Sequence, residues 1–298
     1  MKLSDIDDLF VPLLAEKGLP KVYLEQMVEM VFPLVSRWLS EFDNSSPQIW
    51  GVQGCQGSGK TTLCDFLAIY IEQFSDLKAK VCSIDDFYLT KKQRQNLAEK
   101  EHSLLNTRGV PGTHDVDLIM QAFDDVKNNS LHTLPVFSKA DDDRIETNKW
   151  PVWNESPDLL IFEGWCVGLT PQANDQLHPP INELEMNEDK QGQWRVFVNT
   201  CLQNEYAGIF SNLDKLLSIQ APSFDCVYEW RSQQEKQLAQ QLQKENKATT
   251  GLMTDEQIKR FISHYERLTK HAFNTMGSYA DAILTLNKDH TFDKMYVT

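Results

Sequence analysis

The chain has 298 residues, of which 41% are apolar and 10% aromatic, enough for one large α/β core or two small ones. Its formal charge of −14 argues against a broad surface for nucleic acid or an acidic membrane, and no segment is apolar for long enough to span a bilayer. The opening MKLSDIDDLF carries acids and no sustained apolar run, so we expect no secretory signal. Six cysteines without a C-x-x-C pair predict reduced thiols, a cytoplasmic location and no structural zinc.

The N-terminal part of the chain is predicted to be helical. Residues 21–42 place apolar side chains at helical spacing, and Pro33 should kink or split that helix. We therefore expect residues 1–46 to form a helical extension without a catalytic role, packed on a main domain of residues 47–298.

The main domain begins with the order strand, loop, helix, strand. QIWGV (48–52) is a buried apolar run, residues 60–74 repeat apolar side chains at helical spacing, and KVCSI (80–84) is the next strand. Such a βαβ unit requires parallel strands. Further strands are expected at 158–162, 216–220 and 225–229, with a last strand at 280–286; helices at 194–210, 229–243 and from 254 onward; a surface excursion at 171–193; and a loop at 244–251.

The loop between the first strand and its helix carries a phosphate-binding motif. GCQGSGKT (54–61) matches G-x-x-x-x-G-K-[ST] at every fixed position. Backbone N–H groups of such a loop hold the phosphates of ATP, Lys60 neutralises their charge, and the Thr61 hydroxyl binds Mg²⁺. The candidate ATP-binding residues are Gly54, Cys55, Gln56, Gly57, Ser58, Gly59, Lys60, Thr61 and Thr62. In this context the motif predicts a three-layer αβα fold of the P-loop NTPase type with a mostly parallel central sheet.

Acidic residues follow two of the predicted strands. Asp85 and Asp86 lie in SIDDFYLT, and Glu163 ends the strand in DLLIFEGW. Ligands of open parallel sheets bind outside the carboxyl ends of the strands, so these acids should face the phosphate loop. A kinase needs a carboxylate that accepts the proton of the attacking hydroxyl, and Glu163 has the position of a Walker B acid near Mg²⁺. The alternative is that the two aspartates only cap a strand or start a turn.

Two polar segments lie between the acidic strand ends. NTRGVPGTHDVDL (106–118) and LPVFSKADDDR (134–144) would each read as a solvated loop when taken alone. Their position between the two carboxylate strands is where an insertion that covers a phosphate acceptor would emerge.

These motifs in this order resemble the D-glycerate 3-kinase and yeast kinase-like group, relatives of uridine kinase, phosphoribulokinase and pantothenate kinase. The resemblance covers about residues 48–286 and rests on SIDDFYLT, RGVPGTHD, FEGW and VYEWRSQQE. It implies that Asp85 is the catalytic base and that Arg231 acts on the transferring phosphoryl group. The residues it assigns to the acceptor side are Asp86, Tyr88, Arg108, His114, Asp115, Lys139 and Arg144.

The predicted function is therefore an ATP- and Mg²⁺-dependent kinase for a small hydroxylated molecule, with D-glycerate as the first choice of acceptor. The acids of FSKADDDR predict that a strongly anionic acceptor such as a sugar phosphate is disfavoured, whereas one carboxylate can be held by an arginine. Alternatives are a nucleoside or pantothenate-like acceptor, a nucleotide-binding regulatory module, or, last, an ATP-driven motor. No nucleic-acid or membrane partner is expected, and the sequence leaves the oligomeric state open.

Overall fold

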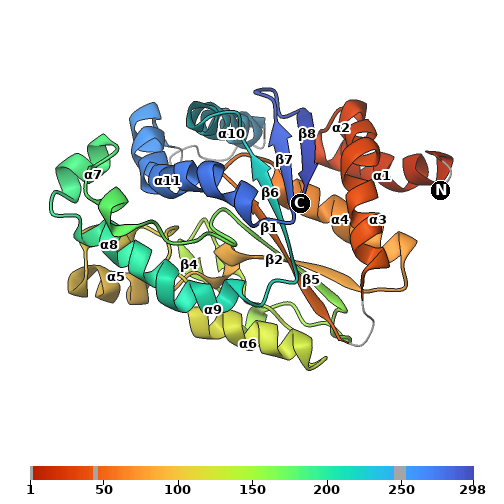
Figure 1. Cartoon of the computed structure of the whole chain (residues 1–298), viewed down its shortest axis with the longest axis horizontal. Coiled ribbons are helices and arrows are strands. Elements are labelled where there is room, and N and C mark those ends of the chain that lie inside the picture. Colours follow the sequence, from red (N-terminus) through yellow and green to blue (C-terminus); the bar gives the residue numbers. More distant parts are fainter. Residues whose placement is uncertain (1–2, 43–45, 245–252) are drawn as a thin grey trace.

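The computed structural model describes residues 3–42, 46–244 and 253–298, so most of the predicted loop at 244–251 lies outside the described residues (Figure 1). Its central sheet has six strands in the order β2–β5–β1–β6–β7–β8. The strands are β1 Gln48–Gly54, β2 Ala79–Ser83, β5 Leu159–Gly164, β6 Lys215–Gln220, β7 Ala282–Leu286 and β8 Phe292–Val297. All neighbours pair in parallel except β7 and β8, which confirms the predicted mostly parallel sheet.

Helices cover both faces of this sheet because its strands are apolar on both sides. Along β5, Leu159 and Ile161 belong to one core, while Leu160 and Phe162 belong to the other. The helices that contribute to the first core are α1 Leu3–Lys17, α2 Lys21–Gln26, α3 Phe32–Ser40, α4 Lys60–Phe74 and α10 Phe224–Lys244. Those that contribute to the second core are α6 Val116–Lys127, α7 Glu183–Glu188, α8 Gln193–Cys201 and α9 Ala207–Phe210. Helix α11, Asp255–Thr275, contributes to both cores. The three-layer αβα prediction is confirmed.

The segment between β2 and β5 holds the smaller elements. It contains α5 Lys91–Lys100, α6 and a two-stranded antiparallel ribbon of β3 Phe137–Ser138 and β4 Asp143–Arg144. The ribbon lies at the carboxyl end of β2, where the backbone N–H of Phe137 donates to the Asp86 carboxylate.

The N-terminal helices pack on α4, the helix that follows the phosphate loop. The ring of Phe10 stacks on Phe66 with centroids 5.3 Å apart, and Phe32 stacks on Tyr70 at 4.1 Å. A π-helical turn, Met27–Val31, interrupts the helix just before Pro33, which lacks the N–H that an unbroken helix requires. The division into an extension of residues 1–46 and a domain of residues 47–298 stays a prediction.

Two predictions at the C-terminal side were wrong: the strand at 225–229, and the position of the strand at 280–286 as the last one. Residues 225–229 are not a strand but the first turns of α10, where Cys226, Val227 and Trp230 are buried with helical spacing. Residues 282–286 do form a strand, yet it is not the last one. The antiparallel edge strand β8 follows it, and its mostly exposed side chains give little hydrophobic signal.

Two further predictions need refinement. The helical run at 194–210 contains a π-helical turn, Leu202–Tyr206, between α8 and α9. The surface excursion at 171–193 contains α7, whose Glu185 is fully buried and paired with Arg267 on α11. This ion pair fixes the excursion to the domain.

Candidate active site

The phosphate loop lies at the carboxyl end of β1 and leads directly into α4. Gly57 and Gly59 both have positive φ angles, of 79° and 81°, which residues other than glycine rarely adopt. A Cβ atom on Gly57 would in addition lie 2.8 Å from Cβ of Trp230, whereas one on Gly59 would meet nothing within 4 Å. The loop conformation therefore depends on glycine at both positions, and at Gly57 also on the closeness of α10.

Glu163, the last residue but one of β5, contacts the two residues of the loop that are predicted to bind Mg²⁺ and the phosphates, Thr61 and Lys60. The Thr61 hydroxyl donates to Glu163 Oε1 at 2.8 Å, and Lys60 Nζ lies 3.9 Å from Glu163 Oε2. Glu163 is only 2% exposed, and Oε2 has no hydrogen-bond partner. A hydroxyl beside a buried carboxylate oxygen that lacks a partner fits a Mg²⁺ ion whose remaining ligands are phosphate and water oxygens. No preformed cluster of three His, Cys, Asp or Glu side chains occurs in the described ranges.

The acids that follow β2 lie on a 3₁₀ turn, Ile84–Phe87. Asp85 accepts hydrogen bonds from the Tyr88 hydroxyl at 2.8 Å and from Lys139 Nζ at 2.9 Å. Burial alone would raise the pKa of Asp85, but the charges of Lys139 and Lys60 outweigh it and lower that pKa to about 2. Asp85 is therefore a carboxylate at neutral pH, within the electrostatic field of the phosphate-loop lysine.

Asp86 has the opposite electrostatic environment. Burial is the main cause that raises its pKa to about 6; the charges of Asp85 and Glu163 act in the same direction, and the hydrogen bond from Phe137 N opposes them. The pKa values of the two neighbouring acids are thus shifted in opposite directions, although the sequence alone treats them as a pair.

Around this acid pair the structure gathers most of the predicted acceptor-side residues. The Tyr88 ring stacks on His114 with centroids 4.6 Å apart and meets Phe137 edge-on at 5.2 Å. The Arg108 guanidinium lies 5.4 Å from the centre of the Phe137 ring. These contacts connect the segments 106–118 and 134–144 above the end of β2, as the sequence predicts for an acceptor-covering insertion.

Other charged side chains of these two segments form ion pairs within the protein itself. The Asp115 side chain caps α6 by accepting from Leu118 N, and it pairs with Arg144 at 2.7 Å. Asp142 pairs with both Arg108 and the fully buried Arg94, so cations of the protein itself balance its charge. The acids of FSKADDDR are therefore partly structural, a role that the sequence analysis did not anticipate.

Arg231 lies on α10, which packs against the phosphate loop. The backbone nitrogen of Arg231 is 3.7 Å from the Cβ position of Gly57, and its guanidinium pairs with Glu235 at 2.7 Å. Glu235 also accepts from the backbone N–H of Met253. Arg231 is thus next to the loop, but its guanidinium pairs with α10 itself and packs over Phe261.

A cavity of about 370 Å³ adjoins the outer side of the phosphate loop. Aromatic side chains of Tyr23, Trp230 and His290 and amides of Gln233 and Gln234 line it, together with Gly57–Gly59 and Thr62. The His290 ring stacks on Trp230 and its Nε2 lies 2.8 Å from the Gly57 carbonyl oxygen. Sequence reasoning missed this cavity because the residues come from the N-terminal helices, α10 and the β7–β8 hairpin, which share no motif.

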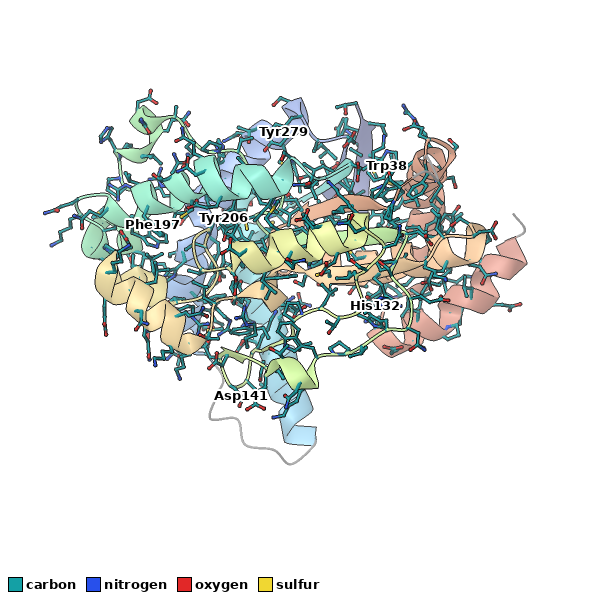
Figure 2. The ribbon with its side chains drawn as sticks, turned by 90° about the horizontal axis from the view of Figure 1, so that it is seen from below. Trp38, His132, Asp141, Phe197, Tyr206 and Tyr279 are labelled. Atoms are coloured by element: carbon teal, nitrogen blue, oxygen red, sulfur yellow. The ribbon has the colours of Figure 1, made fainter. Side chains whose placement is uncertain are left out.

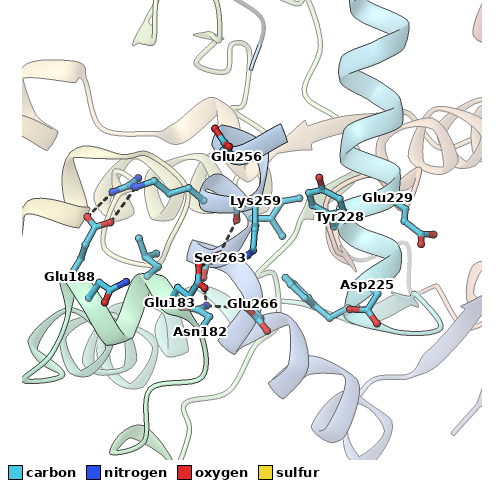
Figure 3. A pocket seen from close by; sticks show the side chains of 15 residues that line it. Asn182, Glu183, Glu188, Asp225, Tyr228, Glu229, Glu256, Lys259, Ser263 and Glu266 are labelled. Carbon is cyan, nitrogen blue, oxygen red and sulfur yellow. Dashed lines mark hydrogen bonds and ion pairs between the residues drawn. The ribbon is translucent and has the colours of Figure 1, made fainter. Parts of the chain in front are cut away.

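A second cavity, of about 870 Å³, lies between α7, α10 and α11 (Figure 3). None of the predicted site residues lines it, and its acids Glu183 and Glu188 pair with Lys259 and Arg260. None of the residues that line this cavity belongs to the phosphate loop.

Comparison with known proteins gives the family. No family model matches the chain. It is 32% identical to "Uncharacterized kinase mug58" of Schizosaccharomyces pombe over 74% of this chain and 78% of that protein, and 31% identical to "Probable ATP-dependent kinase TDA10" of Saccharomyces cerevisiae over 90% and 94%. It is 29% identical to the chloroplastic D-glycerate 3-kinase of Arabidopsis thaliana over 83% of this chain, which spans 54% of that protein.

The fold comparison agrees with the sequence comparison. The solved structure of a D-glycerate 3-kinase from Cryptococcus neoformans superposes with a TM-score of 0.70 at 27% identity, covering 92% of this chain and 98% of the other. The fold and the phosphate loop thus define a P-loop kinase that uses ATP. Within that class, the chain belongs to the group of kinases that contains glycerate kinase and TDA10. The described helices include none that combines the length and apolarity needed to cross a membrane.

The two glycines of the phosphate loop provide a matched test of its packing. Gly59→Ala should cost about 1–2 kcal/mol of unfolding free energy from backbone strain alone. Gly57→Ala should cost about 1–3 kcal/mol more, because its new Cβ also clashes with Trp230. Urea unfolding of both variants measures the difference, and equal losses would show that the contact between α10 and the loop is unimportant.

The raised pKa of Asp86 predicts a pH-dependent stability. Between about pH 4 and 6 folded Asp86 keeps a proton that the unfolded chain releases, so the unfolding free energy falls as the pH rises through this window. Asp86→Asn should remove this penalty and exceed the wild type at pH 8 by at most about 3 kcal/mol, with no gain at pH 4. The exposed Asp76→Asn serves as control. A stability difference that is the same at both pH values contradicts the prediction.

Proposed function

We propose that the protein is an ATP-dependent D-glycerate 3-kinase, which transfers the γ-phosphoryl group of ATP to a hydroxyl of D-glycerate. The observation that carries the proposal is the cluster at one sheet edge, where Lys60, Thr61 and Glu163 lie beside the ionised Asp85. The similarity to D-glycerate 3-kinases supports the choice of acceptor. Phosphoryl transfer requires little covalent chemistry from the protein, so a cluster of charges with a positioned carboxylate is the kind of site that this reaction needs.

On this proposal the triphosphate lies on the backbone N–H groups of residues 54–61, with Lys60 on its oxygens. Thr61 and Glu163 hold Mg²⁺, which neutralises charge on the phosphates when bound. The adenosine end extends into the cavity beside Trp230 and His290, whose stacked rings and neighbouring amides suit a planar heterocycle.

The acceptor side is proposed to use the residues above β2. Asp85 orients the attacking hydroxyl and accepts its proton late in the transfer, since a carboxylate with such a low pKa is a weak base. Lys139 and Arg108 are the cations proposed to hold the single carboxylate of glycerate, and each would exchange an aspartate partner for it. Arg231 would reach the transferring phosphoryl group only after it leaves Glu235.

The proposed roles of Lys60 and Asp85 can be separated by mutation. Lys60→Ala should remove most ATP binding, because the phosphates lose their principal cation. Asp85→Asn should keep ATP binding and lower the transfer rate by about a hundredfold or more. Calorimetric ATP binding and steady-state rates measure the two effects, with the exposed Asp117→Asn on α6 as control. An unchanged rate in Asp85→Asn would refute the assignment of the base.

The choice of acceptor is tested by a substrate panel. Coupled detection of ADP release with D-glycerate, other hydroxy-acids, nucleosides and pantothenate should show turnover that depends on the acceptor and is fastest with D-glycerate. Equal turnover across the panel, independent of the acceptor, would contradict a small-molecule kinase. Preference for a nucleoside or for pantothenate would keep the kinase but replace the acceptor.

A further inference from the structure

Two hydrogen bonds join the Tyr206 hydroxyl to Gly112 and His114. The backbone N–H of Gly112 donates to the Tyr206 hydroxyl oxygen at 3.0 Å, and the same oxygen lies 2.6 Å from Nδ1 of His114. His114 is 3% exposed and Tyr206 is fully buried at the end of the π-helical turn between α8 and α9 (Figure 2). Both groups are thus out of contact with bulk water.

The donors in this arrangement can be assigned by counting hydrogens. The Gly112 N–H can only donate, so the Tyr206 oxygen accepts there and has its own hydrogen left to give. Donation of that hydrogen to His114 Nδ1 satisfies both the hydroxyl and Nδ1, and leaves only Nε2 without a partner. If Nδ1 carried the hydrogen instead, two groups would lack partners among the hydrogen bonds of the described residues: the Tyr206 hydroxyl as a donor and Nε2 as an acceptor. Nδ1 is therefore the acceptor, and the imidazole hydrogen is on Nε2.

The Nε2–H of His114 then remains a buried donor without a partner. Burial lowers the pKa of His114 to about 3, and the charge of Asp85 opposes this only in part, so the ring is neutral at physiological pH. Buried donors are rarely left unpaired unless a ligand or water supplies the acceptor. The ring stacks on Tyr88, whose hydroxyl donates to Asp85, so the unpaired donor belongs to the surroundings of the candidate base.

We propose that Tyr206 is a positioning residue that holds His114 in the neutral Nε2–H tautomer, and that His114 thereby offers a hydrogen bond to an oxygen of the phosphate acceptor. A neutral donor suits this place because it binds a hydroxyl or carboxylate oxygen without adding a positive charge that would weaken Asp85 as a base. The identity of the ligand rests on the proposed kinase function. The tautomer does not, so the two can fail separately.

Nuclear magnetic resonance of the full chain labelled with ¹⁵N-histidine tests the tautomer directly. His114, assigned from the signal missing in His114→Gln, should show a protonated Nε2 and an unprotonated Nδ1 from pH 6 to 8. In Tyr206→Phe the Nδ1–H form should become populated. An Nδ1–H or doubly protonated His114 in the wild type would overturn the proposal, whatever reaction the protein catalyses.

Kinetics test whether the tautomer serves the acceptor. Tyr206→Phe should raise KM for the acceptor about tenfold and leave KM for ATP unchanged, the effect of one lost hydrogen bond. Tyr70→Phe, which removes a hydroxyl bonded to Ser36 on the opposite face of the sheet, should change neither. A Tyr206→Phe enzyme with wild-type acceptor KM would overturn the proposal.

The variants His114→Gln and His114→Asn test the Nε2 donor if Tyr206→Phe does not fold. The amide N–H of glutamine takes about the place of Nε2–H, whereas that of asparagine takes the place of Nδ1. His114→Gln should therefore keep an acceptor KM closer to the wild type than His114→Asn, by about tenfold. Equal losses in both variants would contradict an Nε2 donor.

Discussion

The register of three neighbouring parallel strands determines where the chemistry of this chain is placed. Val52 of β1 pairs with Glu163 of β5, and Ser83 of β2 pairs with the same glutamate from the other side. The chain then leaves β1 into the phosphate loop and leaves β2 into the turn that carries Asp85. A shift of one residue in the β1–β5 pairing would turn Glu163 away from Thr61, because successive side chains of a strand point to opposite faces. The same shift between β2 and β5 would displace the turn that carries Asp85 relative to Glu163. Gly164 permits this packing, since a Cβ there would lie 2.3 Å from Ile84.

Charge is arranged unevenly around that edge. Although the chain has a net charge of −14, the cations Lys60, Lys139 and Arg108 lie beside the predicted site, each already paired with an acid. Such pairing lets the folded protein bury acids near a triphosphate site without leaving isolated charges. It also means that an anionic acceptor replaces existing partners. Asp85 and Asp86 show how strongly the local environment sets the pKa of a carboxyl group, since lysines lower one pKa and burial raises the other.

Sequence reasoning predicted the parts that depend on local patterns. The phosphate loop, the βαβ unit and the acidic strand ends each have a motif or a periodicity of their own, and all appear at the expected edge of the sheet. Sequence reasoning failed where contacts between distant residues determine the local structure. Residues 225–229 read as a strand because Val227 and Tyr228 favour extended structure, yet burial of Trp230 against Gly57 goes with a helix. Tyr206, Arg94 and the cavity beside His290 carry no signal, since each acts through a residue distant in the sequence.

The central claim is that an acceptor hydroxyl binds between Asp85 and a triphosphate held on the phosphate loop. A crystal structure of the full chain with Mg²⁺, a non-hydrolysable ATP analogue and D-glycerate tests it most directly. The account predicts the γ-phosphate against Lys60, and a glycerate hydroxyl within hydrogen-bond distance of the Asp85 carboxylate and in line with the γ-phosphorus. Glycerate bound elsewhere, with Asp85 still held by Lys139 and no hydroxyl beside it, would contradict the account.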